Sequence, residues 1–286
     1  MSEPNYESEW WGYIYDQMMA QQQDWVDANL RFYQANLREV NGPVLECACG
    51  TGLMWLPLLA LGHDMHGFDI SRSMLATLTR KAAEQGISDI AARISVQELE
   101  SFHYDQQFSA ILIPTNTFSM LTTQEAQIRT LRNIHAHLAP AGKLLLDLQL
   151  AGVRGVEEKA TEGRWHIWTH PETGRPIRQR VVGQIDFNNQ RILDQCFIEY
   201  DGQSAEFPMT ARWIFKEEFV LLLRLAGFGI GRILVRLRAT RSSSGHRSSK
   251  ATGLSIKDER CQWPHNSGPY MRKESRCQHT NPWNFQ

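Results

Sequence analysis

The most informative part of the chain reads Val44-Leu45-Glu46-Cys47-Ala48-Cys49-Gly50-Thr51-Gly52, a short apolar run that passes into a glycine loop. Turn residues precede it and an apolar stretch at 53–61 follows it, so the pattern predicts a strand, a loop and a helix. Glycines directly after a strand let a ligand approach the backbone. Gly50 and Gly52 are therefore candidate ligand-binding residues.

A second unit of the same kind follows. His66-Gly67-Phe68-Asp69-Ile70 predicts a strand that ends in an acid, Ser71 is a candidate N-cap, and 73–85 has helical periodicity. Asp69 lies 23 positions after Glu46, near the spacing of about 20 at which a carboxylate binds ribose hydroxyls. The two units together predict a nucleoside ligand.

The remaining pattern indicates an α/β fold. Two helices are expected before the first strand, within 10–40, and further strands at 92–96, 108–114 and 142–150, with a helix at 123–138. Alternation of this kind predicts a doubly wound, mostly parallel, Rossmann-like sheet with N-terminal helices.

Between 164 and 214 the apolar period changes to two, which predicts an inserted antiparallel hairpin region. Its turns are expected at 170–174 and 188–190, and a helix follows at 216–225. We expect the insertion to lie over the ligand pocket.

The ordered motifs resemble those of class I S-adenosylmethionine (SAM)-dependent methyltransferases. The resemblance runs from about Tyr13 to Phe228 and departs from the family pattern in three places: Ala48 replaces the first glycine, Ala141 replaces a glycine before the fifth strand, and Glu98 replaces the usual Asp. It implies SAM as cofactor and a sheet of the methyltransferase type.

The resemblance also implies a cofactor site. Glu46 would bind the amino group of SAM, Asp69 the ribose hydroxyls, and Glu98 the adenine amino group. For Tyr15 and Met74, packing in the core is an equal alternative. The implied cofactor-binding residues are Tyr15, Glu46, Ala48, Cys49, Gly50, Gly52, Asp69, Ile70, Met74, Glu98, Leu99 and Ile113.

Because the sulfonium of SAM already activates its methyl group, the protein would mainly align a small-molecule acceptor and exclude water. The sequence requires no metal and identifies neither the acceptor nor a catalytic residue. Possible general bases, which the sequence does not rank, are His103, Tyr104, His135, His166 and His170.

Composition limits the partners and the cellular compartment that we expect for this chain. The 286 residues carry 30 Lys and Arg against 31 Asp and Glu, so nucleic acid is not an expected partner of the chain as a whole. No apolar stretch reaches the roughly 18 residues that span a bilayer, and the acidic start does not resemble a secretory signal. Five irregularly spaced cysteines predict no disulfide framework, and we expect a cytoplasmic protein.

The C-terminal part breaks the pattern. From Arg232 the chain has 11 Lys and Arg against 3 Asp and Glu, and few apolar residues follow Val235. We therefore expect a methyltransferase domain at 1–231 and a disordered basic tail at 232–286, from a frameshifted or otherwise replaced C-terminus. Only Ile230 to Leu237 resembles a further strand, which would leave the fifth strand at the sheet edge. Possible but ill-spaced zinc ligands in the tail are Cys261, His265, Cys277 and His279.

Two alternatives to a small-molecule methyltransferase stay open. One is a non-catalytic SAM-binding or partner-binding protein with a damaged C-terminus. The other is a nucleic-acid-associated methyltransferase whose basic tail follows phosphates. The sequence leaves the oligomeric state undetermined.

Overall fold

The computed structural model describes residues 9–148, 163–170, 172–235 and 254–258. The core helices are α1 (Glu9–Ala20), α2 (Gln23–Leu37), α3 (Trp55–Ala60), α4 (Arg72–Glu84), α5 (Gln124–His137) and α7 (Lys216–Leu225), with short 3-10 turns η1 (Ile90–Ala92) and η2 (Thr117–Met120). Sheet A is formed by β1 (Val44–Cys47), β2 (Met65–Asp69), β3 (Ile94–Val96), β4 (Phe108–Ile113), β5 (Leu138–Leu146), β10 (Ile230–Val235) and β11 (Leu254–Asp258).

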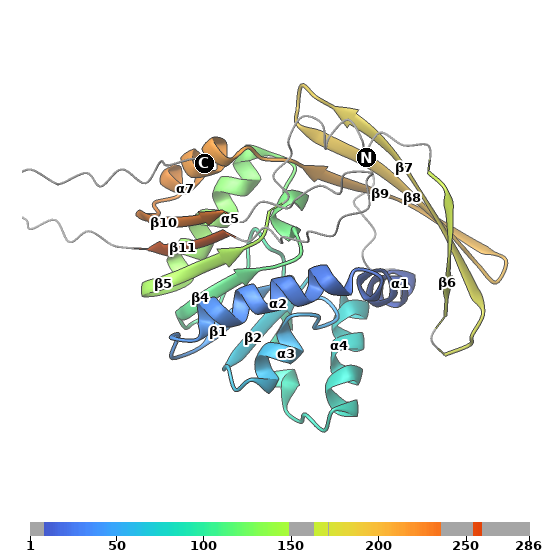
Figure 1. The fold of residues 1–286 in the computed structure, drawn as a ribbon, viewed down its shortest axis with the longest axis horizontal. Coiled ribbons are helices and arrows are strands. Elements are labelled where there is room, and N and C mark those ends of the chain that lie inside the picture. The colour runs from blue at the N-terminus through green and yellow to red at the C-terminus, as the bar shows by residue number, and fades with distance from the viewer. Residues whose placement is uncertain (1–8, 149–162, 171, 236–253, 259–286) are drawn as a thin grey trace, which may run out of the picture.

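Sheet A has the strand order β10-β11-β5-β4-β1-β2-β3, and its five strands from β5 to β3 pair in parallel. Strand order reverses between β1 and β4, so a crevice is expected beyond their carboxyl ends. Helices α2, α3 and α4 cover one face of the sheet and α5 and α7 the other (Figure 1). This confirms the predicted doubly wound Rossmann-like architecture.

Alternating strand residues supply two separate cores. Leu45, Ile111 and Leu144 pack on the α5 and α7 side, whereas Val44 and Leu112 pack on the α2, α3 and α4 side. A buried strand of a parallel sheet needs apolar side chains on both faces. Burial on both sides therefore explains the apolar residues Val44, Leu45 and Cys47 before the glycine loop.

The insertion forms sheet B, a four-stranded antiparallel sheet of β6 (Trp165–Thr169), β7 (Pro176–Asp186), β8 (Arg191–Tyr200) and β9 (Gln203–Arg212). Its inner face packs against α1 and against Met74 of α4 (Figure 1). The predicted hairpin region and its two turns are confirmed. A further turn at Asp201-Gly202 has positive φ at both residues, 49° and 78°.

A buried arginine fixes sheet B to the helices on the far side of sheet A. Arg212 of β9 is 5% exposed and donates to the side chain of Gln127 of α5 over 3.1 Å and to Gln190 over 3.0 Å. It also forms an ion pair with Glu218 of α7. A charge buried this deeply is costly unless it is fully paired, which accounts for three partners.

The structure corrects one expectation for the C-terminus. A second strand, β11, pairs antiparallel with β5 and with β10, so β5 is not an edge of sheet A. Apolar and polar residues do alternate in Leu254-Ser255-Ile256-Lys257. This run is too short to predict a strand within a tail that is otherwise polar. The rest of the tail, including the four zinc-ligand candidates, lies outside the described residues. The division at 231 and the frameshift hypothesis stay predictions.

Several boundaries shift by a few residues. β5 begins at Leu138, four residues before the predicted start, and β3 begins at Ile94. Ser71 and Thr123 are N-caps of α4 and α5, as their side chains accept from Met74 and Ala126 backbone N–H groups.

Within the described ranges, no helix has the length and apolar character needed to cross a membrane.

Candidate active site

The loop after β1 bends tightly, because three alternate residues in it have positive φ values. Ala48 and Gly50 have φ values of 55° and 51°, and Gly52 has a φ of 81°. A Cβ on Gly52 would meet carbons of Leu56 and Leu78 at 3.0 Å. Gly52 is therefore required by close packing of the loop on α4, while Gly50 presents its backbone toward the end of β2.

Asp69 ends β2 and closes the other side of this bend. Its Oδ2 accepts from the Gly50 backbone N–H over 2.9 Å, and its Oδ1 accepts from the Ser71 N–H over 2.8 Å. Burial raises the pKa of this carboxyl, and hydrogen bonds from the backbone N–H groups of Ser71, Gly50 and Ile70 oppose that shift. An ionised carboxylate has about four acceptor positions, so it can still accept from a ligand hydroxyl.

Glu46 of β1 has a buried carboxyl oxygen that is not satisfied by the protein. Its side chain is 2% exposed, and its Oε2 has no hydrogen-bond partner. Burial, and then the nearby charges of Asp69 and Asp147, raise the pKa of Glu46 well above its usual value. A buried acceptor without a donor is unfavourable, so this atom suits a ligand that brings a cationic donor.

A third buried acid, Asp147, lies directly after β5 and was not predicted. It accepts from the Tyr33 hydroxyl over 2.6 Å and from the backbone N–H groups of Thr115 and Asn116 over 2.8 and 3.0 Å. Burial raises its pKa to about 6. The signal was present, because Leu144-Leu145-Leu146-Asp147 repeats the pattern of an apolar strand that ends in an acid.

Three consecutive residues of α1 connect the parts of this region. Tyr15 is half-buried and hydrogen-bonded to Thr115, and burial raises its pKa. Asp16 accepts from the hydroxyl of buried Thr51 over 2.6 Å. Gln17 donates to the backbone carbonyl of Thr169 in β6 over 2.6 Å. Helix α1 thus contacts the glycine loop, the loop after β4 and sheet B within one turn.

Of the other predicted cofactor-binding residues, Cys49 is buried in the apolar cluster on the α2, α3 and α4 side of sheet A, and the remaining five divide into two groups. Ile70 and Glu98 are exposed and Leu99 is half-buried beside the ends of β2 and β3, where a ligand can reach them. Met74 and Ile113 are buried in apolar clusters, Met74 beneath sheet B and Ile113 on the α5 side of sheet A. For these two, packing accounts for the side chain, and a ligand contact stays a prediction.

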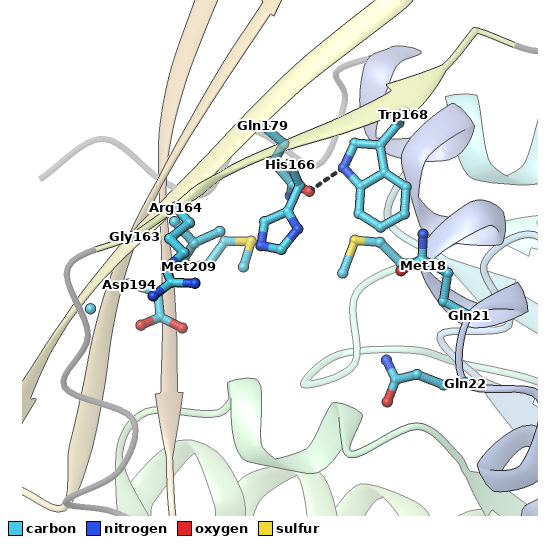
Figure 2. Close-up of a pocket in the computed structure, with 12 residues that line it drawn as sticks. Met18, Gln21, Gln22, Gly163, Arg164, His166, Trp168, Gln179, Asp194 and Met209 are labelled. Carbon is cyan, nitrogen blue, oxygen red and sulfur yellow. Dashed lines mark hydrogen bonds between the residues drawn. The ribbon is translucent and has the colours of Figure 1, made fainter.

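A pocket of about 590 Å³ lies between sheet B and the end of α1 (Figure 2). His166 and Trp168 form part of its wall, with ring centroids 6.2 Å apart, and the Trp168 indole N–H donates to Gln179 over 2.8 Å. Met18 of α1 lies beside Trp168, one turn beyond Tyr15 (Figure 2). The further lining residues are Gln21, Gln22, Gly163, Arg164, Val181, Gly183, Asp194 and Met209.

The five possible general bases differ in their positions relative to the pocket. His166 lines the pocket. Tyr104 donates to the backbone of Gly67, and His170 accepts from two N–H groups of its own turn, so both have structural roles. His135 packs on Phe228, and His103 is largely exposed beside Asp105.

Comparisons with known proteins give the family. A model of the "Methyltransferase domain" family matches residues 44–142. The provisionally assigned methyltransferase YqeM of Bacillus subtilis (strain 168) is 30% identical over 242 residues, which cover 81% of this chain and 90% of YqeM. The chain belongs to the class I SAM-dependent methyltransferase family. It is an enzyme whose cofactor is SAM.

Other relatives of this methyltransferase agree. The cypemycin N-terminal methyltransferase of a Streptomyces species is 26% identical over 224 residues, which cover 76% of this chain and 87% of the relative. A SAM-dependent methyltransferase from Clostridium acetobutylicum superposes with a TM-score of 0.61 at 15% identity, covering 85% of this chain and 96% of that one. The sugar N-methyltransferase KedS8 from a Streptoalloteichus species gives 0.60 at 16% identity, covering 86% and 93%. The two superpositions show a shared fold.

The methyltransferase site suits SAM. The buried Glu46 Oε2 lacks a donor, and SAM carries a cationic amino group. Apolar Ile70 and Val96 are 46% and 41% exposed at the ends of β2 and β3, although burial would be expected for such side chains, so they offer an apolar surface for an adenine ring. Within the described part of the chain, no three His, Cys, Asp or Glu side chains gather as possible metal ligands.

Proposed function

We propose that this enzyme methylates an amine nitrogen of a compact acceptor bound between α1 and sheet B. The observation that carries the proposal is the pocket beneath sheet B, one turn along α1 from Tyr15. The pocket is wide enough for a small molecule, and its wall combines apolar side chains with a few polar groups, as ligand sites do.

The cofactor contacts of this proposal follow from the site geometry. Glu46 holds the amino group of SAM, and Asp69 holds the ribose hydroxyls with the acceptor positions that Gly50 and Ser71 leave open. The left-handed bend at Gly50 lets the ligand lie against backbone. Glu98, Leu99 and Ile70 surround the adenine.

When bound, SAM supplies an electrophilic methyl group that needs no further activation. The chain's own residues then have three tasks: they align the acceptor nitrogen, they exclude water, and they remove a proton from the nitrogen. Trp168 and Met18 form the walls that align the acceptor, and α1 covers the site through Tyr15. His166 is the proton acceptor of this proposal, since it alone of the five candidates lines the pocket.

The choice of nitrogen is supported by the relatives. The Streptomyces relative is named as an N-terminal methyltransferase and KedS8 as a sugar N-methyltransferase. The pocket wall carries both Arg164 and Asp194, so the choice of nitrogen rests on these two relatives and not on the charge of the wall.

The cytoplasmic location expected from the sequence is part of the same proposal. The thiols of Cys47, Cys49 and Cys196 are buried and free, which is compatible with a reducing compartment.

Two measurements test the proposal. Calorimetric titration with SAM should show one site per chain, and radioactive methyl transfer from SAM should label members of a panel of primary amines, amino sugars and short peptides with free N-termini. Absence of SAM binding contradicts the cofactor site, and labelling of hydroxyl or thiol compounds alone contradicts the amine acceptor.

Pocket variants give a sharper test once a labelled amine is found. His166→Asn should lower kcat and change the pH dependence of the rate, whereas Trp168→Leu should mainly raise KM. His103→Asn is the matched control, because His103 is exposed and away from the pocket. Equal effects of the His166 and His103 substitutions would contradict a role for the pocket.

A further inference from the structure

Asp147 joins three separate elements at the carboxyl ends of the sheet. Its side chain is 4% exposed, its Oδ1 accepts from the Tyr33 hydroxyl of α2 and the Thr115 N–H, and its Oδ2 accepts from the Asn116 N–H. Both oxygens are therefore occupied by the loop that follows β4. None of the contacts that hold SAM in the proposed function uses this acid.

The loop that Asp147 binds is in an unfavourable conformation. Thr115 and Asn116 have φ values of 57° and 60°, in the left-handed region that costs a residue such as Thr115 about 1–2 kcal/mol and that asparagine adopts more readily. Consecutive N–H groups in such loops point to one side and form an anion site. The Asp147 carboxylate fills that site, which explains how two successive left-handed residues persist.

This loop contacts helix α1, which also binds the glycine loop through Asp16 and Thr51. The side chain of Thr115 is hydrogen-bonded to Tyr15, and Tyr15 is close enough to Glu46 and Asp147 for both charges to affect its pKa. We infer that Asp147 is a positioning residue, which holds the loop after β4 against Tyr15 and so shapes the wall of the SAM site. The inference rests on the proposed function.

The charge of Asp147 gives the inference a measurable signature. Burial raises the pKa of Asp147 to about 6, while hydrogen bonds from Tyr33, Asn116 and Thr115 hold it lower than burial alone would. The titratable groups that face it are Tyr33 of α2, Tyr15 of α1 and Glu46 of β1. Below about pH 6 the added proton turns one oxygen into a donor, so it no longer accepts both loop N–H groups.

The test is calorimetric titration with S-adenosylhomocysteine between pH 5 and pH 8. A site that needs ionised Asp147 should bind about 10-fold more weakly at pH 5 than at pH 7.5. Asp147→Asn should bind about 10- to 100-fold more weakly at pH 7.5, as expected when charge-assisted hydrogen bonds are lost. Tyr33→Phe should move the midpoint above that of the wild type, because the Tyr33 hydroxyl lowers the pKa of Asp147.

A second readout separates Asp147 from Glu46, whose carboxyl also titrates. In nitrogen-15 NMR spectra, the backbone amides of Thr115 and Asn116 should shift with the same midpoint as binding, and Tyr33→Phe should move both midpoints together. A merely structural Asp147 would leave the binding midpoint unchanged in Tyr33→Phe. That result, or amides that do not titrate near pH 6, overturns the inference.

Failure of the inference and failure of the proposed function are distinguishable. If S-adenosylhomocysteine does not bind at any pH, the cofactor site is wrong. If it binds with an affinity that is constant from pH 5 to pH 8, the SAM site stands and the positioning role of Asp147 is wrong. The wild-type and Tyr33→Phe measurements decide this even if Asp147→Asn does not fold.

Discussion

The backbone N–H of Gly50 donates to Asp69 Oδ2 over 2.9 Å, which joins the glycine loop after β1 to the end of β2. The second oxygen of Asp69 accepts from Ser71. One carboxylate thus shapes the loop and caps the next connection before any ligand binds. The proposed ribose contact would be made by a group that is already fixed in place.

Asp69→Asn should disrupt both contacts. The amide has one acceptor atom, so its NH₂ group must face either the Gly50 or the Ser71 N–H, and one backbone donor is left unpaired. We expect a loss of about 1–3 kcal/mol in the free energy of unfolding and a large loss of SAM affinity. Urea denaturation followed by tryptophan fluorescence, with exposed Asp105→Asn as control, measures the first effect. Unchanged stability in Asp69→Asn would contradict this account of the loop.

Ala48→Gly should stabilise the protein. Ala48 has a φ of 55° and lies where many members of the family have glycine. A left-handed backbone is unfavourable for alanine, which has a Cβ, but not for glycine. After the greater entropy of an unfolded glycine is counted, we expect a gain of about 0.5–1 kcal/mol.

Ala141→Gly, with a φ of 62°, should change stability in the same direction, whereas Ala126→Gly in α5 should lower it by about 1 kcal/mol. Thermal unfolding of the three variants is the measurement. A loss of stability in both Ala48→Gly and Ala141→Gly would show that neither backbone is strained.

Thr51→Val tests the attachment of α1 to the glycine loop. The Thr51 hydroxyl is buried and donates to Asp16, which also pairs with Lys81 of α4. Loss of this hydrogen bond should cost about 1 kcal/mol, or about a fivefold loss of S-adenosylhomocysteine affinity if α1 must close over the ligand. Thr79→Val is the control, because the Thr79 hydroxyl bonds within its own helix. Equal affinity of both variants would show that α1 does not contribute to binding.

Glu46→Gln should have opposite effects on stability and on binding. Because the folded-state pKa of Glu46 is raised, the native protein retains this proton to higher pH than the unfolded chain does, and stability falls as pH rises above about 4.5. Removing the charge should therefore stabilise the ligand-free protein by about 1–2 kcal/mol at pH 8, with a smaller gain near pH 4.5.

The same substitution should weaken SAM binding, since a neutral amide attracts the cationic amino group less strongly. Urea denaturation at the two pH values and calorimetry measure the two effects, with exposed Glu39→Gln as the control. If Glu46→Gln binds SAM as tightly as the wild type does, Glu46 does not bind the cofactor.

Much of the fold could be predicted because its signals are local. Strands β1 and β2, the cap at Ser71 and helix α7 follow from runs and turns within a few residues of sequence. β11 was missed since its five residues lie in a polar tail, and only pairing with β5 on one side and β10 on the other identifies them as a strand.

The site was predicted in part for a similar reason. Asp69 and Glu46 follow from strand ends next to the glycine loop, whereas the role of Asp147 depends on contacts with Tyr33 and Thr115, which are far from it in sequence. The ranking of His166 above the other candidate bases needed sheet B to be placed over α1. Contacts between residues that are far apart in the sequence produce no periodic pattern from which they could be predicted.

A crystal structure of the protein with S-adenosylhomocysteine measures the central claim directly. The account predicts a ribose whose hydroxyls bind Asp69, an amino group within hydrogen-bond distance of Glu46, and a chain of ligand atoms lying along Gly50. A ligand bound elsewhere, with Glu46 Oε2 still unpaired and Asp69 bound only to backbone, would contradict it.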